Sequence, residues 1–215
     1  METGTIKIKT LLVSLALVIA MELAAGFVYS SSGGADNLLL VLGVTRFLEA
    51  IAIAVAVLIL EGDLSSLGLS ISHAASGFKK GLVWSVCFGI VVLFVSVIMF
   101  ASGINPLDLL HTRLPVGKGG TVLFFVVGGI VSPVAEEMLF RGVVYGFLRR
   151  WGIFVAVTLS TLAFVLVHPG GSGIPLPQIT GGILFAVAYE KERNLLVPIV
   201  IHVLGNMAIF SFSLV

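Results

Sequence analysis

The sequence predicts an all-α membrane protein, a polytopic bundle of about seven transmembrane helices, and three observations support this. Of its 215 residues, 58% are hydrophobic and only 11% are charged, whereas a soluble domain carries about 25% charged residues. The apolar residues are gathered in runs of about 20, the length at which a helix crosses a bilayer. Little sequence lies between the runs. We therefore expect a single transmembrane domain over residues 1–215 and no separate soluble domain.

Seven apolar runs are long enough to be spans. The first follows Lys7 and Lys9 as in a signal peptide, but no clear small-residue cleavage pattern follows, so we expect a retained helix. After the second run, the Gly- and Ser-containing segment 61–80 ends in a basic pair and indicates a short interfacial connection. The expected spans are 9–29, 38–60, 81–102, 120–148, 151–168, 174–190 and 195–214.

The basic residues predict the orientation. Cytoplasmic loops carry an excess of Lys and Arg. With seven spans, the side of the N-terminus receives Lys7, Lys9, Lys79, Lys80, Arg149, Arg150, Lys191 and Arg193, and the other side receives only Arg113 and Lys118. We therefore expect a cytoplasmic N-terminus, in a prokaryotic plasma membrane that suits so short a chain. An eighth span, hidden in one of the runs, would break up this bias.

Composition also limits the partners. The net charge is +1, which indicates no polyanionic partner such as nucleic acid. The bilayer is one expected partner, and the oligomeric state is left open. Cys87 is the only cysteine, so no intrachain disulfide is expected.

Two adjacent carboxylates, Glu136 and Glu137, lie inside the fourth span, and Arg141 follows. Charge at membrane depth is costly and indicates a functional site. Because residues at i and i+4 share a helix face, Glu137 and Arg141 can form an ion pair. Glu136 points about 100° away around the helix. We interpret Glu136 as the reactive carboxylate and the Glu137–Arg141 pair as structural. The Ser132-Pro133 step just before them is expected to break or kink the helix and admit water.

Polar groups on two later spans could meet Glu136. His168 ends the fifth span, and His202 and Asn206 lie at i and i+4 on one face of the seventh. Counted from the inner boundary, Glu136 lies roughly 20 Å deep, His168 roughly 26 Å, His202 roughly 12 Å and Asn206 roughly 18 Å. One cavity could gather all four.

The second span also carries charge. Arg46 and Glu49 lie three residues apart and could neutralise one another, while Glu22 on the first span has no local partner. The sequence leaves the roles of these three residues open.

The set formed by Glu136, His168, His202 and Asn206 has the parts that a peptide hydrolase needs. A carboxylate can take a proton from water, an imidazole can orient that water, and His202 and Asn206 can donate to an oxyanion. The sequence contains no GxSxG motif, no HExxH motif and no paired intramembrane aspartates. This argues against serine, zincin and aspartyl proteases.

Three motifs together resemble those of the CPBP family, the CAAX-prenyl-protease and bacteriocin-processing (Abi) membrane proteins. They are Glu136-Glu137-xxx-Arg141, Phe164-xxx-His168 and His202-xxx-Asn206, in that order. The resemblance covers residues 120–215 as a catalytic core and implies an intramembrane endopeptidase that cuts near the C-terminus of a membrane-associated or lipidated, CAAX-like substrate.

By resemblance, Glu136 with His168 would activate water and His202 with Asn206 would form the oxyanion site. Glu137 and Arg141 would hold the architecture. The family has been described both as zinc-dependent and as metal-independent. Zinc, if bound, would be held by Glu136, His168 and His202. We favour the metal-independent reading, because Glu136 then remains the base.

Two other classes compete with the protease. One is a non-catalytic peptide-binding or bacteriocin-immunity protein on the same scaffold, although a pure binder needs no activated carboxylate. The other is a small proton-coupled transporter, which the absence of an internal repeat makes less favoured.

Overall fold

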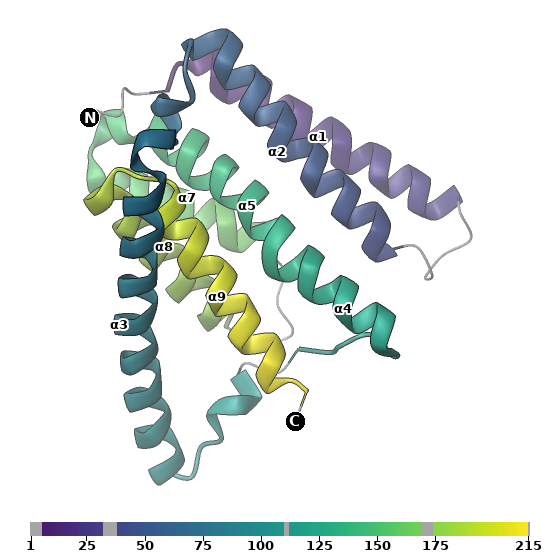
Figure 1. The fold of residues 1–215 in the computed structure, drawn as a ribbon, viewed down its shortest axis with the longest axis vertical. Coiled ribbons are helices and arrows are strands. Elements are labelled where there is room, and N and C mark those ends of the chain that lie inside the picture. Colours follow the sequence, from purple (N-terminus) through teal and green to yellow (C-terminus); the bar gives the residue numbers. More distant parts are fainter. Residues whose placement is uncertain (1–5, 32–37, 110–111, 169–173, 215) are drawn as a thin grey trace.

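The computed structural model describes residues 6–31, 38–109, 112–168 and 174–214, and these residues form helices without a strand (Figure 1). The all-α prediction is confirmed for this part of the chain. Seven helical rods account for most of it: α1 (Ile8–Ser31), α2 (Leu38–Glu61), α3 (Ala74–Ala101), a composite rod over 118–151, α7 (Ile153–Leu166), α8 (Leu176–Glu192) and α9 (Leu196–Phe212).

The rods differ in how well they match a bilayer. Four helical stretches are long and apolar enough to cross one: Ile8–Ser31, Leu38–Glu61, Leu64–Ala101 and Lys118–Trp151. α7 and α9 are apolar but have 14 and 17 residues, fewer than the roughly 20 that a span requires. The molecule is thus a helical membrane bundle in which the late helices are short.

The connection between α2 and α3 is shorter than the sequence indicates. Two 3₁₀ turns, η2 (Leu64–Leu67) and η3 (Ile71–His73), follow α2. Asp63 caps η2 through the Ser65 N–H, and Gly68 ends it with φ 75°. No Pro or positive-φ residue interrupts the chain after that, so α3 begins at Ala74, seven residues before the expected start at 81. The basic pair 79–80 therefore lies inside α3.

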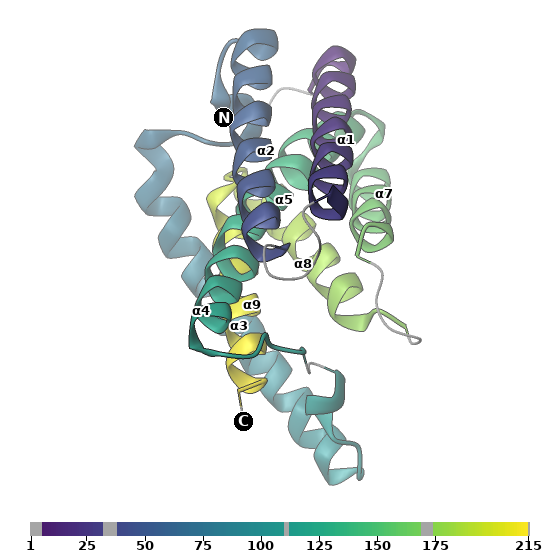
Figure 2. The same cartoon turned by 90° about the vertical axis from the view of Figure 1, so that its right-hand side faces the viewer.

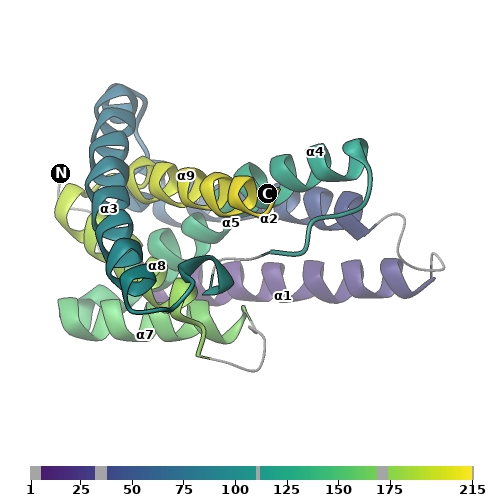
Figure 3. The same ribbon diagram turned by 90° about the horizontal axis from the view of Figure 1, so that it is seen from below.

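The composite rod forms the centre of the bundle. α1 and α2 lie side by side along one flank, and α9 lies beside the rod between it and α3 (Figures 1 and 2). Seen from below, α7 and α1 lie on the side of the bundle opposite α9 (Figure 3). The buried side chains concentrate in the rod over 132–147, while α1 and α3 expose mostly apolar side chains. Those exposed faces are suited to lipid contact.

One end of the bundle collects the basic residues. Lys80 pairs with Glu192 at 2.7 Å, and Arg149 pairs with Glu190 at 2.9 Å. Arg150 also donates to the main-chain oxygen of Ile6 at the start of the described chain. The helix ends that carry the predicted inner-face cations are therefore neighbours in space. Which side of the membrane this end faces stays a prediction.

The helix does not break at Ser132-Pro133, which was one of the two outcomes expected there. The rod runs through α4 (Lys118–Val126), η5 (Val127–Val131), α5 (Ser132–Glu137), η6 (Met138–Tyr145), α6 (Gly146–Leu148) and η7 (Arg149–Trp151). η5 and η6 are π-helical. A π-bulge changes the hydrogen-bond register, and here it accommodates the proline without ending the helix.

Candidate active site

The buried ion pair predicted on the central rod is present. Nη1 of Arg141 lies 3.0 Å from Oε1 of Glu137, and both side chains are 0% exposed. The other terminal nitrogen of Arg141 donates to the Gly182 oxygen on α8 at 3.1 Å. The guanidinium also lies over the rings of Phe164 and Phe185, 4.7 and 5.1 Å from their centroids. This pair therefore connects the rod to α7 and α8.

Glu136 points to a different set of partners, as its place on the helix requires. Its Oε2 lies 3.4 Å from Nε2 of His168 at the end of α7 and 3.7 Å from Nε2 of His202 on α9. The Glu136 side chain is 11% exposed. Three of the four predicted site residues thus meet at one point. The contacts are longer than a charge-assisted hydrogen bond of about 2.8 Å, as is common in catalytic sites without substrate.

The other ring nitrogen of each histidine fixes its tautomer. Nδ1 of His168 lies 2.7 Å from the Phe164 carbonyl, and Nδ1 of His202 lies 2.8 Å from Oε1 of Glu137. A carbonyl, or a carboxylate paired with Arg141, can only accept. Both Nδ1 atoms must therefore carry the proton. In their neutral forms, the two imidazoles present Nε2 lone pairs to Glu136, so the site gathers three proton acceptors.

Aromatic rings hold the two imidazoles in place. The Phe164 ring lies 4.3 Å from the His168 ring, centroid to centroid, and Phe185 stacks on His202 at 4.6 Å with a 22° interplanar angle. The sequence analysis did not identify Phe185 or Gly182, both on α8, as site residues. Gly182 contributes its main-chain oxygen, so no side chain marks its role. The Phe185 ring is one of fifteen phenylalanines and carries no local mark of its role.

Asn206, the fourth predicted site residue, bonds to the π-helical segment of the rod, and no hydrogen bond in the described chain joins it to Glu136, His168 or His202. The Ser132 N–H donates to the Val127 oxygen, five residues back. In the same register the Gly128 oxygen would need the N–H of Pro133, and proline has none. Nδ2 of Asn206 donates to this Gly128 oxygen instead, at 2.8 Å. One of its two amide N–H groups remains for another acceptor.

Whether the site suits zinc depends on the donor atoms of Glu136, His168 and His202. Both Nδ1–H groups point to oxygen acceptors, which is also the usual outer-shell pattern of zinc-bound histidines. The two Nε2 atoms and the Glu136 carboxylate are also donors of the kind that zinc takes. In the described chain no three such side chains are drawn together closely enough to enclose an ion, and we derive no step through zinc.

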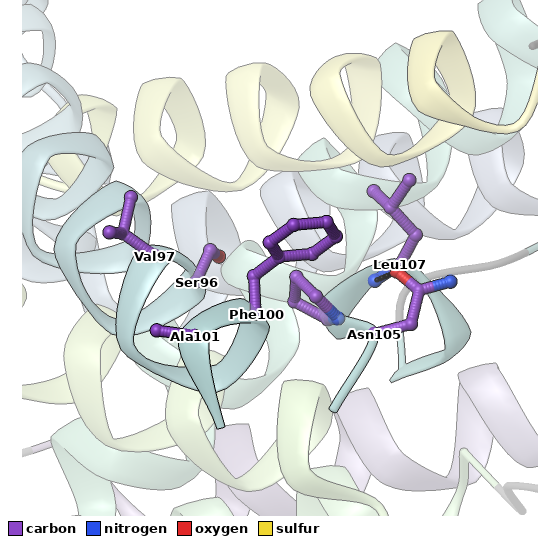
Figure 4. Close-up of a pocket in the computed structure, with 7 residues that line it drawn as sticks. Ser96, Val97, Phe100, Ala101, Asn105 and Leu107 are labelled. Atoms are coloured by element: carbon purple, nitrogen blue, oxygen red, sulfur yellow. Dashed lines mark hydrogen bonds between the residues drawn. The ribbon is translucent and has the colours of Figure 1, made fainter. Parts of the chain in front are cut away.

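A pocket of about 410 Å³ lies elsewhere, between the end of α3 and η4 (Pro106–Leu109) (Figure 4). Its lining is apolar apart from Ser96 and Asn105, and it holds no titratable side chain. Asn105 is already bonded to Asp108. This pocket has no groups for hydrolysis, which leaves the Glu136 cluster as the candidate site.

Comparison with known proteins gives one family match. Residues 118–208 match the family model described as type II CAAX prenyl endopeptidase Rce1-like. This region contains Glu136, His168, His202 and Asn206. No solved structure gives a significant match.

Two curated bacterial proteins are similar to this chain. One is the "Membrane-embedded CAAX protease MroQ" of Staphylococcus aureus, 36% identical over 99 residues, which covers 43% of this chain and 39% of that protein. The other is the "Putative membrane peptidase YdiL" of Bacillus subtilis, 28% identical over 209 residues, which covers 92% of this chain and 83% of that protein. The first match is thus confined to less than half of either chain, whereas the second runs along most of both.

Proposed function

This chain belongs to the CPBP family of membrane CAAX proteases, and on that premise we propose that it is an intramembrane endopeptidase. Its substrate would be a membrane-associated or lipidated protein, cut near a CAAX-like C-terminus. The observation that carries the proposal is the position of the Glu136 carboxylate, 3.4 and 3.7 Å from two imidazole nitrogens inside the bundle.

Hydrolysis would begin with a water molecule beside Glu136. The oxygen of this water attacks the scissile carbonyl carbon while one proton of the water passes to the Glu136 carboxylate. His168 would orient the water. The tetrahedral intermediate then collapses. The C–N bond breaks as the proton held at Glu136 passes to the leaving nitrogen, which also receives the second proton of the water, and the products are a new carboxylate and an ammonium group.

The oxyanion of the intermediate would be stabilised by donors from α9. Asn206 retains one amide N–H beside its bond to Gly128. His202 can donate through Nε2 only when it is doubly protonated, because Nδ1 already donates to Glu137. The carboxylate of Glu137 would then offset the positive charge of the doubly protonated imidazole. In this proposal Glu137 orients His202 in addition to pairing with Arg141.

The test uses the full chain in nanodiscs with a fluorogenic peptide that ends in a prenylated Cys-Ala-Ala-X sequence. Glu136→Gln keeps the size of the side chain but cannot act as a base, so kcat should fall by at least about 100-fold. Glu192→Gln, at the end of the bundle, is the matched control and should cleave at the wild-type rate. Mass spectrometry of the products identifies the bond that is cut. Equal cleavage by Glu136→Gln and the wild type would refute the proposal.

A further inference from the structure

Three charged side chains gather on α1 and α2, outside the region that the family model matches. Nη1 of Arg46 lies 2.8 Å from Oε2 of Glu49, and its Nη2 lies 2.8 Å from Oε1 of Glu22. The first contact is within α2 and the second joins α2 to α1. Each arm of the guanidinium thus pairs with a different carboxylate, with hydrogen-bond geometry at Glu49.

Burial makes this cluster costly. The Glu49 side chain is 2% exposed and that of Arg46 is 24% exposed, in helices whose other faces are apolar. Oε1 of Glu49 is buried and has no hydrogen-bond partner within the described chain. Charges at membrane depth indicate function unless a structural reason explains them. An ion pair alone would need one carboxylate, whereas Arg46 has two.

The cluster lies at the depth of Glu136. Arg46 is 15 residues from the inner end of α2 at Glu61, or roughly 22 Å, and Glu136 is 13 residues from Arg149, or roughly 20 Å. α2 packs directly against α5, which carries Glu136. Arg46 forms no ion pair with Glu136 or His168, so its charge would act on them through space.

The proposed reaction needs a fixed positive charge in this place. A negative charge resides first on the Glu136 carboxylate, then on the oxyanion, and finally on the new product carboxylate. In an apolar site each of these states is unfavourable without a nearby cation. A cation that is already oriented needs no rearrangement during the reaction. Arg141 already has a structural role, because it joins the rod to α7 and α8.

We propose that Arg46 is a positioning residue of the active site, a fixed counter-charge for the reacting groups that Glu22 and Glu49 hold in place. The inference rests on the proposed peptidase function and extends it. The active site would then be incomplete within residues 118–208, because α2 supplies a charge to it and α1 supports that charge.

The test compares four variants in nanodiscs with the same fluorogenic peptide. Arg46→Gln should lower kcat at least about tenfold, less than the roughly 100-fold expected for a donor in direct contact, and leave KM unchanged. Arg46→Lys keeps the charge and should recover most of kcat. Glu22→Gln leaves the Arg46–Glu49 pair intact and should lower kcat by less than Arg46→Gln does.

The fourth variant separates a counter-charge from a merely structural ion cluster. The triple variant Arg46→Gln, Glu22→Gln, Glu49→Gln removes the whole cluster and leaves none of its three charges without a partner. If the cluster is only structural, this variant should melt at a different temperature but cleave at the wild-type rate per folded molecule. We expect the wild-type melting temperature with kcat as low as that of Arg46→Gln.

Two results would overturn the inference. One is a triple variant with wild-type kcat. The other is an Arg46→Gln protein whose activity falls only in proportion to its folded fraction, measured by size-exclusion chromatography and thermal unfolding. Glu136→Gln is measured in parallel. If Glu136→Gln cleaves as fast as the wild type, both the proposed function and this inference are refuted. If Glu136→Gln has a low kcat while the triple variant has the wild-type kcat, only this inference is refuted.

Discussion

Asn206 on α9 donates a 2.8 Å hydrogen bond to the main-chain oxygen of Gly128, the carbonyl that the π-bulge and Pro133 leave without a main-chain donor. The side chain thus has a structural partner as well as a proposed catalytic one. Because Asn206 satisfies a main-chain carbonyl, its removal should affect the stability of the protein and not only its turnover.

We predict that Asn206→Ala lowers kcat by about 100-fold through loss of an oxyanion donor. It should also lower the free energy of unfolding by about 1–3 kcal/mol, because the Gly128 oxygen loses its partner. Kinetics and thermal unfolding in detergent measure the two effects. Ser211→Ala, which removes an exposed hydroxyl bonded within α9, is the control on the same helix. An unchanged melting temperature for Asn206→Ala would show that the Gly128 bond contributes little.

Arg141 should be required for folding. Arg141→Ala leaves Glu137 fully buried without its ion-pair partner, a change that costs about 3–5 kcal/mol. The expected result is a low yield of monodisperse protein after purification. Arg141→Lys keeps the charge but loses the planar contact with Phe164 and Phe185, so its yield should be intermediate. Arg113→Ala, at an exposed position, should purify as the wild type does.

His168 should affect turnover more than folding. Its side chain is 30% exposed at the end of α7, so His168→Ala removes few packing contacts. We expect kcat to fall by about 100-fold or more with little change in melting temperature. His73→Ala replaces an exposed histidine far along the chain and serves as the control. A His168→Ala protein that turns over normally would mean that Glu136 activates water without it.

Cleavage should survive metal chelation. The proposed mechanism uses Glu136 itself as the base and draws on no metal-bound water. We expect the same rate before and after treatment with a chelator, and substoichiometric zinc in elemental analysis of the active protein. Loss of activity on chelation, restored by added zinc, would show that the site rearranges to bind the metal.

The orientation can be measured with single cysteines. The two variants Lys79→Cys and Arg113→Cys are made in a Cys87→Ala background. Lys79 lies at the basic end of the bundle, and Arg113 lies in the connection between η4 and α4. Both positions are exposed. If the basic end is cytoplasmic, a membrane-impermeant maleimide should label Arg113→Cys in intact cells and Lys79→Cys only after permeabilisation. The reverse pattern would invert the predicted topology.

Local geometry explains what could be predicted from the sequence. The composition and the length of the apolar runs determine a helical membrane protein. The i, i+4 spacing determines the Glu137–Arg141 pair and the separate direction of Glu136, because one helix fixes both. These features depend on the rise and rotation of a single helix, which the sequence alone specifies.

Only the tertiary structure decided how the helices meet. The tautomers of His168 and His202 depend on acceptors from the chain around them, and the bond from Asn206 depends on a π-register that no local pattern marks. The Ser132-Pro133 step continues the helix where a break was expected, since Asn206 on a distant helix satisfies the carbonyl that the proline leaves free. Arg46 and Glu22 meet because α1 packs on α2. Each of these contacts joins segments far apart in sequence, and packing between helices, not the propensity of any one of them, sets the distances.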